Sequence, residues 1–116
     1  MQAIETRYRG RVYRSRTEAR WAVVFDEMGL DYEYELQGYN LRGHRYLPDF
    51  WLTEPEWWVE IKGSTPNARE QELARLLMLE SGRSAYIFCG QPANPRDGGF
   101  AVWSYPALGE AVPNES

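Results

Sequence analysis

The pattern of hydrophobic and polar positions along the chain predicts two helices. The first follows Ser15, which forms the S-x-x-E pattern of a capping box with Glu18, and it stops at Gly29. The second runs from about residue 66 to residue 81, with Gly82 after it. Large apolar side chains recur at helical spacing in both segments and give each helix one apolar face: Trp21, Ala22, Phe25 and Met28 in the first, and Leu73, Leu76 and Leu77 in the second.

Apolar runs, alternating or continuous, predict five strands, at residues 31–36, 46–52, 57–62, 84–89 and 100–105. Short turns join the first three strands, so these should be antiparallel. The second helix joins the third strand to the fourth, and such a crossover predicts parallel strands. The predicted fold class is therefore α/β, with a mixed central sheet of about four to five strands flanked by two helices. Residues 37–44 should form a turn or loop, and residues 8–13 a short hairpin or extended arm.

The length of 116 residues predicts a single domain spanning residues 1–116, with a basic N-terminal arm at 7–14 and a loose tail at 106–116. The content of 43% hydrophobic and 26% charged residues excludes a disordered chain. The single cysteine cannot form an internal disulfide, no apolar run approaches membrane-spanning length, and the N-terminus lacks a signal-peptide core. These features predict a soluble cytoplasmic protein with no membrane partner.

Arginine residues are concentrated near the N-terminus, although the whole chain has a net charge of −4. Six of the twelve arginines fall between residues 7 and 20, where Glu18 is the only acidic residue. A basic patch on an acidic protein is still an electrostatic footprint for the phosphate groups of nucleic acids. The alternative is a solvated face whose arginines pair with nearby acids.

A second charged group falls inside the predicted sheet. Alternation along residues 57–62 places Glu60 and Lys62 on the same face of the strand as Trp58. The short preceding turn pairs this strand with the one before it, which brings Asp49 beside Glu60. Two converging carboxylates repel each other unless a proton or cation intervenes, and magnesium suits such oxygen ligands. Lys62, the only lysine in the chain, could orient or activate a water molecule there, so these parts suit metal-assisted hydrolysis of a phosphodiester.

Glu18 is a fourth candidate member of this site. It precedes three apolar residues of the first helix by three, four and seven positions, so it lies on the face expected to meet the sheet, where an acid needs a partner. Each residue also has a simpler explanation. Glu18 would only complete the capping box, Asp49 would be a turn or bulge residue, and Glu60 with Lys62 would form a solvated ion pair. Together, these simpler explanations require four independent coincidences in one arrangement. A shared site is therefore favoured.

The segment Pro48-Asp49, followed after ten residues by Glu60-Ile61-Lys62, resembles the PD-(D/E)xK nuclease signature. The preceding stretch YRSRTEARWA resembles the first-helix segment of small phage and bacterial members of that superfamily, which have a glutamate at the place of Glu18. The resemblance covers roughly residues 13–63. It implies a restriction-endonuclease-like core and a location inside a bacterial or phage-infected host cell.

The resemblance also implies roles for individual residues. Asp49 and Glu60 would bind Mg²⁺, for which Mn²⁺ should substitute, and the backbone carbonyl of Ile61 would be a further ligand. Lys62 would position the attacking water, and Glu18 would contact a metal directly or through water. Some branches of the superfamily add a glutamine on the next helix. Gln71 is a candidate for this auxiliary role, and the alternative is a solvated helix residue.

These residues predict a magnesium-dependent deoxyribonuclease, an endonuclease or resolvase-like enzyme with weak sequence specificity or structure-directed cutting. The arginines expected to neutralise DNA phosphates are Arg9, Arg11, Arg14, Arg16 and Arg20. One compact core holds one active site, so cutting both strands would require a homodimer or two successive nicks. Two alternatives stay open on the same fold: a non-catalytic nucleic-acid-binding module, and a nuclease subunit that needs a protein partner for DNA affinity.

Overall fold

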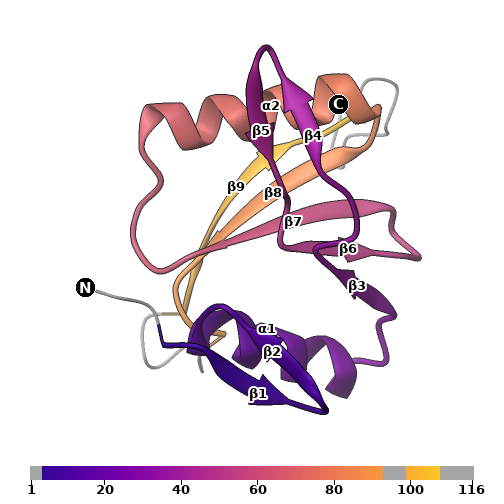
Figure 1. Cartoon of the computed structure of the whole chain (residues 1–116), viewed down its shortest axis with the longest axis vertical. Coiled ribbons are helices and arrows are strands. Elements are labelled where there is room, and N and C mark those ends of the chain that lie inside the picture. The colour runs from indigo at the N-terminus through magenta and orange to yellow at the C-terminus, as the bar shows by residue number, and fades with distance from the viewer. Residues whose placement is uncertain (1–3, 93–98, 108–116) are drawn as a thin grey trace, which may run out of the picture.

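A mixed five-stranded sheet forms the centre of the protein (Figure 1). The computed structural model describes residues 4–92 and 99–107, so most of the tail predicted at 106–116 lies outside the described residues. The strand order is β3-β6-β7-β8-β9. These strands span Tyr32–Tyr34 (β3), Phe50–Leu52 (β6), Trp57–Lys62 (β7), Ser84–Cys89 (β8) and Ala101–Tyr105 (β9).

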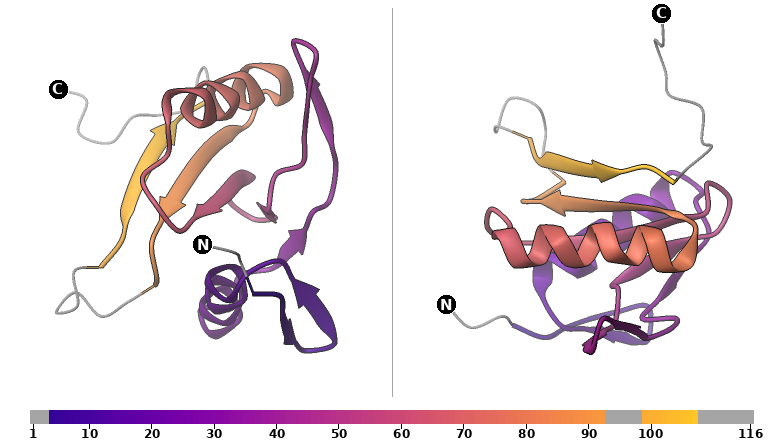
Figure 2. Two further views of the ribbon diagram at one scale, coloured as in Figure 1. Left: turned by 60° about the vertical axis from the view of Figure 1, so that its left-hand side comes forward. Right: turned by 90° about the horizontal axis from the view of Figure 1, so that it is seen from above.

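Two helices cover opposite faces of this sheet, as Figures 1 and 2 show: α1 (Arg16–Glu27) and α2 (Ala68–Ser81). Ser15 caps α1, because its hydroxyl accepts the Glu18 N–H at 3.1 Å. Gly82 ends α2 in the left-handed conformation that glycine adopts without steric cost. The α/β class, the mixed sheet and the two helices are therefore confirmed. Neither helix is long and apolar enough to cross a membrane.

The strand directions follow the lengths of the connections. A four-residue turn joins β6 to β7, and these strands are antiparallel with Phe50 opposite Val59. The connection from β7 to β8 runs through α2, and these strands are parallel, as a helical crossover requires. One step beyond the Phe50–Val59 pair, the register sets Asp49 beside Glu60. The two predicted acids therefore come together because of the sheet register.

Residues 37–44, predicted as a loop, instead contain most of a second hairpin. Its strands are β4 (Tyr39–Leu41) and β5 (His44–Tyr46), and they pair antiparallel outside the main sheet. The turn residues Arg42 and Gly43 both have positive φ, at 52° and 88°, which is the geometry of a tight two-residue hairpin turn. The strand predicted at 46–52 is consequently shorter, because Tyr46 belongs to β5 and β6 begins at Phe50.

The basic N-terminal segment is a hairpin packed on α1. Its strands are β1 (Thr6–Tyr8) and β2 (Arg11–Tyr13), joined by a turn at Arg9 and Gly10. Tyr13 is only 1% exposed and belongs to the main core cluster. Of the two predictions for this segment, the hairpin is confirmed and the extended arm is wrong. The aromatic anchor at position 13 holds the hairpin against the rest of the protein.

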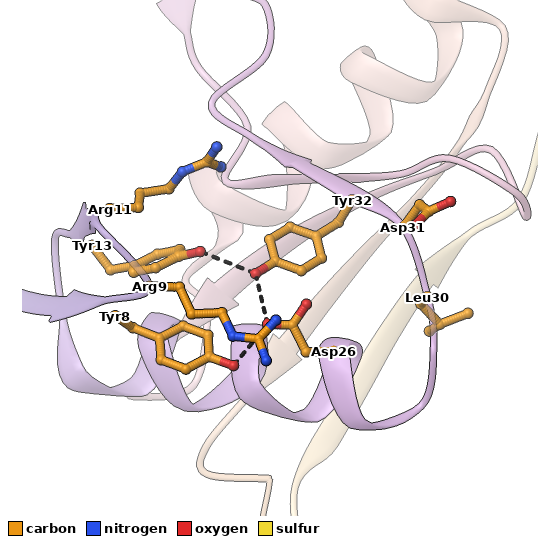
Figure 3. Close-up of a pocket in the computed structure, with 8 residues that line it drawn as sticks. All are labelled: Tyr8, Arg9, Arg11, Tyr13, Asp26, Leu30, Asp31 and Tyr32. Carbon is orange, nitrogen blue, oxygen red and sulfur yellow. Dashed lines mark hydrogen bonds and ion pairs between the residues drawn. The ribbon is translucent and has the colours of Figure 1, made fainter.

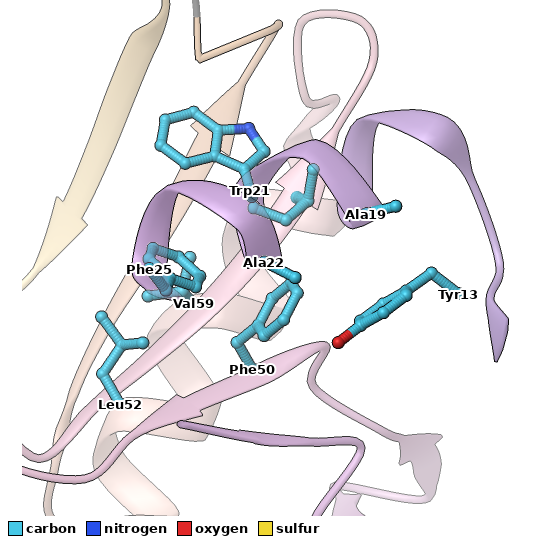
Figure 4. Close-up of a cluster of buried hydrophobic side chains, with 9 residues drawn as sticks. Tyr13, Ala19, Trp21, Ala22, Phe25, Phe50, Leu52 and Val59 are labelled. Carbon is cyan, nitrogen blue, oxygen red and sulfur yellow. The ribbon is translucent and has the colours of Figure 1, made fainter. Parts of the chain in front are cut away.

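The main core lies between α1 and the sheet (Figure 4). Phe50 is fully buried and meets Phe25 edge to face, with ring centroids 5.2 Å apart. Figure 4 shows Tyr13 approaching the same cluster from the side of the hairpin. The cluster contains Tyr13, Ala19, Trp21, Ala22, Phe25, Phe50, Leu52, Val59 and Ile61.

The two faces of β7 are used as alternation predicts. Val59 and Ile61 face α1, whereas Trp58 packs in a second cluster under α2 with Leu76 and Leu77. Met28, expected on the apolar face of the first helix, is 66% exposed because α1 ends at Glu27 and Met28 is its C-terminal cap.

Replacing Phe50 by alanine should cost about 3–5 kcal/mol of unfolding free energy, because it leaves a cavity at the centre of the main core. Urea denaturation of both proteins would measure this change. The control is Val102→Ala, at a β9 position that is 45% exposed, which should change stability by less than about 0.5 kcal/mol. Equal losses in the two variants would contradict the assignment of the core.

Candidate active site

Asp49 and Glu60 are held side by side by two hydrogen bonds that cross between the chain segments bearing them. The Asp49 N–H donates to Oε1 of Glu60 at 3.1 Å, and the Ile61 N–H donates to Oδ2 of Asp49 at 2.8 Å. The Asp49 residue is 2% exposed, so water contributes little to its solvation. Main-chain donors therefore fix one oxygen of each carboxylate and set the orientation of both groups.

The other oxygen of each acid faces a cationic side chain. Oδ1 of Asp49 lies 3.1 Å from Nη2 of Arg14, and Oε2 of Glu60 lies 3.5 Å from Nζ of Lys62. Arg14 was predicted to bind DNA phosphates, and in the structure its guanidinium lies at the carboxylate pair. The same Nη2 also lies 2.7 Å from Oε2 of Glu35.

Lys62 is shared between two glutamates. Its Nζ lies 3.0 Å from Oε2 of Glu70 on α2, while Oε1 of Glu70 accepts the N–H of Asn67 at 2.9 Å. Glu70 thus completes the capping box of α2 and holds the catalytic candidate Lys62. Sequence reasoning missed Glu70. The N-x-x-E pattern at residues 67–70 was the available signal for its cap role.

Glu18 reaches the site from the α1 side. It is buried, as its position on the apolar stripe predicts, and its Oε1 accepts a hydrogen bond from the Tyr34 hydroxyl. The Tyr34 oxygen in turn accepts the N–H of Arg14 at 3.2 Å. Tyr34 therefore joins the helix carboxylate to the segment that carries Arg14, and it is a second residue that sequence reasoning missed.

Burial dominates the electrostatics of the carboxylate pair. It raises the pKa of Asp49 well above the usual range, and the negative charges of Glu60 and Glu18 raise it further. Burial also raises the pKa of Glu60, although the positive charge of Lys62 opposes the shift. The pKa of Lys62 is lowered by burial but raised overall by Glu60 and Glu70, so its amine stays charged. The pair therefore favours a proton or a cation.

Of the two other predicted site residues, Ile61 contacts the carboxylate pair, whereas Gln71 bonds to the backbone before its own helix. The side-chain amide of Gln71 donates to the carbonyl oxygen of Pro66 at 3.1 Å, at the start of its own helix. Ile61 contributes its N–H to Asp49, as described above. His44, the only histidine, is exposed on β5 with Nδ1 2.9 Å from Nη2 of Arg69.

The four other arginines that were predicted to bind DNA line two hollows beside the N-terminal hairpin. Arg9 and Arg11 line a hollow of about 240 Å³ with three tyrosines (Figure 3). Figure 3 shows Arg9 extending past Tyr8 toward Asp26, and its Nη1 lies 3.7 Å from Oδ2 of that acid. Arg16 and Arg20 line a second hollow at the start of α1, where Arg20 donates to Oε1 of Gln91 at 2.8 Å. All four residues are exposed, although Arg9 already pairs with Asp26 and Arg20 with Gln91.

Residues 4–92 and 99–107 contain no group of three or more histidine, cysteine, aspartate or glutamate side chains arranged to hold a metal. The acids that converge at the end of the sheet are thus a pair, Asp49 and Glu60, with Glu18 behind Tyr34. Comparisons of the chain with protein-family models, with curated proteins and with solved structures found no match. The function is therefore inferred from the residues and their geometry.

The raised pKa of Asp49 makes the stability of the metal-free protein depend on pH. The folded protein binds a proton on Asp49 more tightly than the unfolded chain does. The stabilisation that this proton provides is therefore present below the ordinary carboxyl pKa and is lost as pH rises through the folded-state pKa. Asp49→Asn keeps an acceptor for the Ile61 N–H and removes the charge. We expect this variant to be about 1 kcal/mol more stable than wild type at neutral pH in EDTA.

Thermal and urea unfolding between about pH 5 and pH 8 would measure this difference. The matched control is Glu54→Gln, the same kind of change on an exposed carboxylate in the turn between β6 and β7, which should change stability by less than about 0.5 kcal/mol. If the stability of the wild type changed with pH in parallel with that of Asp49→Asn, burial of Asp49 would not raise its pKa, and the prediction would be wrong.

Proposed function

We propose that the protein is a magnesium-dependent deoxyribonuclease of the PD-(D/E)xK superfamily, with a restriction-endonuclease-like core, that hydrolyses DNA phosphodiester bonds. The observation that supports this most is the Asp49–Glu60 pair, locked by crossed main-chain hydrogen bonds with Lys62 at its edge. The sheet order and the two helices on opposite faces are compatible with such a core. The site lies where β6 begins and β7 ends.

The donor set of this pair suits Mg²⁺. This ion is commonly held by one or two protein carboxylates, and water and substrate phosphate oxygens complete its shell, so a cluster of three acids is not required. Asp49 and Glu60 would hold the ion through the two oxygens that main-chain donors leave unbound. The Ile61 carbonyl would be a further ligand, Glu18 would act directly or through water, and Mn²⁺ should substitute for Mg²⁺. Bound Mg²⁺ supplies charge stabilisation at the phosphate and lowers the pKa of a coordinated water.

The charged amine of Lys62 has a role that follows from its partners. Because Glu60 and Glu70 hold it protonated, it donates hydrogen bonds and does not remove a proton. It would orient the attacking water and stabilise negative charge as it develops on the phosphate oxygens. Glu70 fixes the amine from the α2 side and is thus a positioning residue. The amide of Gln71, one residue further along α2, is an auxiliary candidate for contacting that water.

The exposed arginines on the α1 side would contact the DNA backbone. Arg9, Arg11, Arg16 and Arg20 carry the sequence-independent part of binding by neutralising phosphates. Outside the main sheet and the two helices, the described residues form two short hairpins, β1–β2 and β4–β5. This leaves little chain for an elaborate base-reading module, which supports endonuclease or resolvase-like cutting with weak sequence specificity or dependence on DNA structure. With one site per chain, cleavage of both strands uses a homodimer or two nicks.

One observation favours a second candidate function. Arg14 and Lys62 already neutralise part of the charge of the carboxylate pair, so the site is compatible with a folded protein that holds no metal. A DNA-binding module without catalysis, or a nuclease subunit that acts only with a protein partner, would have the same arrangement. Unlike the first candidate, neither of these would cleave DNA as an isolated chain when metal is added.

The test uses labelled single-stranded, duplex, nicked, flapped and four-way-junction DNA, each with Mg²⁺, Mn²⁺ or EDTA. We expect metal-dependent cleavage by the wild type, and a loss of about 100-fold or more in rate for Lys62→Ala, because a preorganised charged donor is removed. Asp49→Ala should abolish cleavage. The control is Arg83→Ala, which removes an exposed cation paired with Glu56 at the opposite end of the β7–β8 pair.

Two results would contradict a nuclease that acts without a partner. Binding without cleavage, unchanged by Lys62→Ala, would support the binding module. Absence of both binding and cleavage would support the partner-dependent subunit, and it would direct the search to proteins that co-purify with this chain.

A further inference from the structure

Arg14 occupies a place that a metal ligand set would need. It follows β2, and its Nη2 lies 3.1 Å from Oδ1 of Asp49, the one oxygen of that acid that no main-chain N–H fixes. The Arg14 side chain is 55% exposed, whereas the Asp49 side chain is almost completely buried. A partly exposed cation therefore pairs with the oxygen through which Asp49 would hold a metal ion.

The guanidinium of Arg14 has a second acidic partner beside Asp49. The same Nη2 lies 2.7 Å from Oε2 of Glu35, a closer approach than to Asp49. Glu35 has a positive φ of 52°, which ends β3, and its N–H donates to the carbonyl oxygen of Asp49 at 2.8 Å. The Arg14 N–H is anchored separately on the Tyr34 hydroxyl. The guanidinium can thus leave Asp49 and keep Glu35, with its backbone unmoved.

We propose that Arg14 is an exchangeable counterion that occupies the cation position of Asp49 until a divalent ion displaces it, and that it then turns to a phosphate of the DNA. This inference rests on the proposed function, because it concerns the metal position of that site. It assigns Arg14 two partners in turn, a carboxylate in the metal-free protein and a phosphate in the complex. The planar guanidinium suits both partners, because each presents paired oxygens.

The exchange couples metal binding to DNA binding. Without DNA, a divalent ion competes with Arg14 for Oδ1 of Asp49 and then stays close to a positive charge, so its affinity is reduced. A DNA phosphate that attracts Arg14 removes both obstacles and raises the metal affinity. By reciprocity the metal raises DNA affinity by the same factor. The site is thereby kept from binding free metal tightly before the substrate arrives.

The test is calorimetric titration of Mn²⁺ into the full chain without DNA. Arg14→Met keeps the length of the side chain and removes the charge, and it should bind Mn²⁺ about tenfold more tightly than wild type. Arg14→Lys keeps the charge but loses the planar fork, so its affinity should lie between the two. The control is Arg11→Met, the same change on an exposed residue of β2 that lines the Figure 3 hollow and not the carboxylate pair.

A second measurement follows the guanidinium itself. In nitrogen-15 NMR spectra of the arginine side chains, Mg²⁺ should shift the Arg14 signal, assigned by its absence in Arg14→Lys, more than those of Arg9 and Arg11. This readout does not depend on cleavage, and it holds even if Arg14→Met fails to fold.

The outcomes distinguish failure of the Arg14 exchange from failure of the proposed nuclease activity. Equal Mn²⁺ affinity of wild type, Arg14→Met and Arg11→Met, with no shift of the Arg14 signal, would overturn the exchange and leave the metal site intact. Absence of Mn²⁺ binding in all variants, together with absence of cleavage, would instead overturn the nuclease itself. Tighter binding in Arg14→Met alone, with the Arg14 signal moving, is the expected result.

Discussion

A buried carboxylate, Asp49, and a partly buried one, Glu60, lie side by side in this protein, and nearby hydrogen-bond donors and cations compensate for their burial. Transfer of a charged group from water into the interior is expensive unless hydrogen bonds and opposite charges compensate. Here the N–H of Asp49, just before β6, and the N–H of Ile61, in β7, each donate to one of the two carboxylates, and Arg14 and Lys62 each pair with one of them. The register of two strands thus determines both the sheet and the geometry of the candidate site.

A layer of tyrosines connects the N-terminal hairpin, α1 and β3 to this pair. Tyr13 and Tyr34 have ring centroids 4.6 Å apart, and the Tyr13 and Tyr32 hydroxyls lie 3.2 Å from each other. Their rings fill the core while their hydroxyls reach buried or half-buried acids, since Tyr34 donates to Glu18 and Tyr32 to Asp26. Such rings serve two purposes at once, because they pack in or against the core and their hydroxyls donate to nearby acids.

Much of the fold and part of the site could be predicted from local rules. The proximity of Asp49 and Glu60 follows from a period of two along strands and from a short turn, and the burial of Glu18 follows from helical spacing. The β4–β5 hairpin was missed because Arg42-Gly43 lacks the Asn-Gly or Asp-Gly signal of a tight turn. The contacts of Arg14 with Asp49, of Lys62 with Glu70 and of Tyr34 with Glu18 depend on where long side chains end in space, and the periodicity of the sequence does not contain this information.

The N-terminal hairpin has a consequence for the smallest version of this protein that can fold. Its sequence is short and basic, so the hairpin could be taken for a segment that can be deleted to obtain a minimal domain. Yet Tyr13 completes the aromatic core, and the residue after it reaches Asp49. The physical boundary of the folding unit therefore lies at or before Thr6, and shortening the chain to begin at α1 would remove a wall of the core and a counterion of the site together.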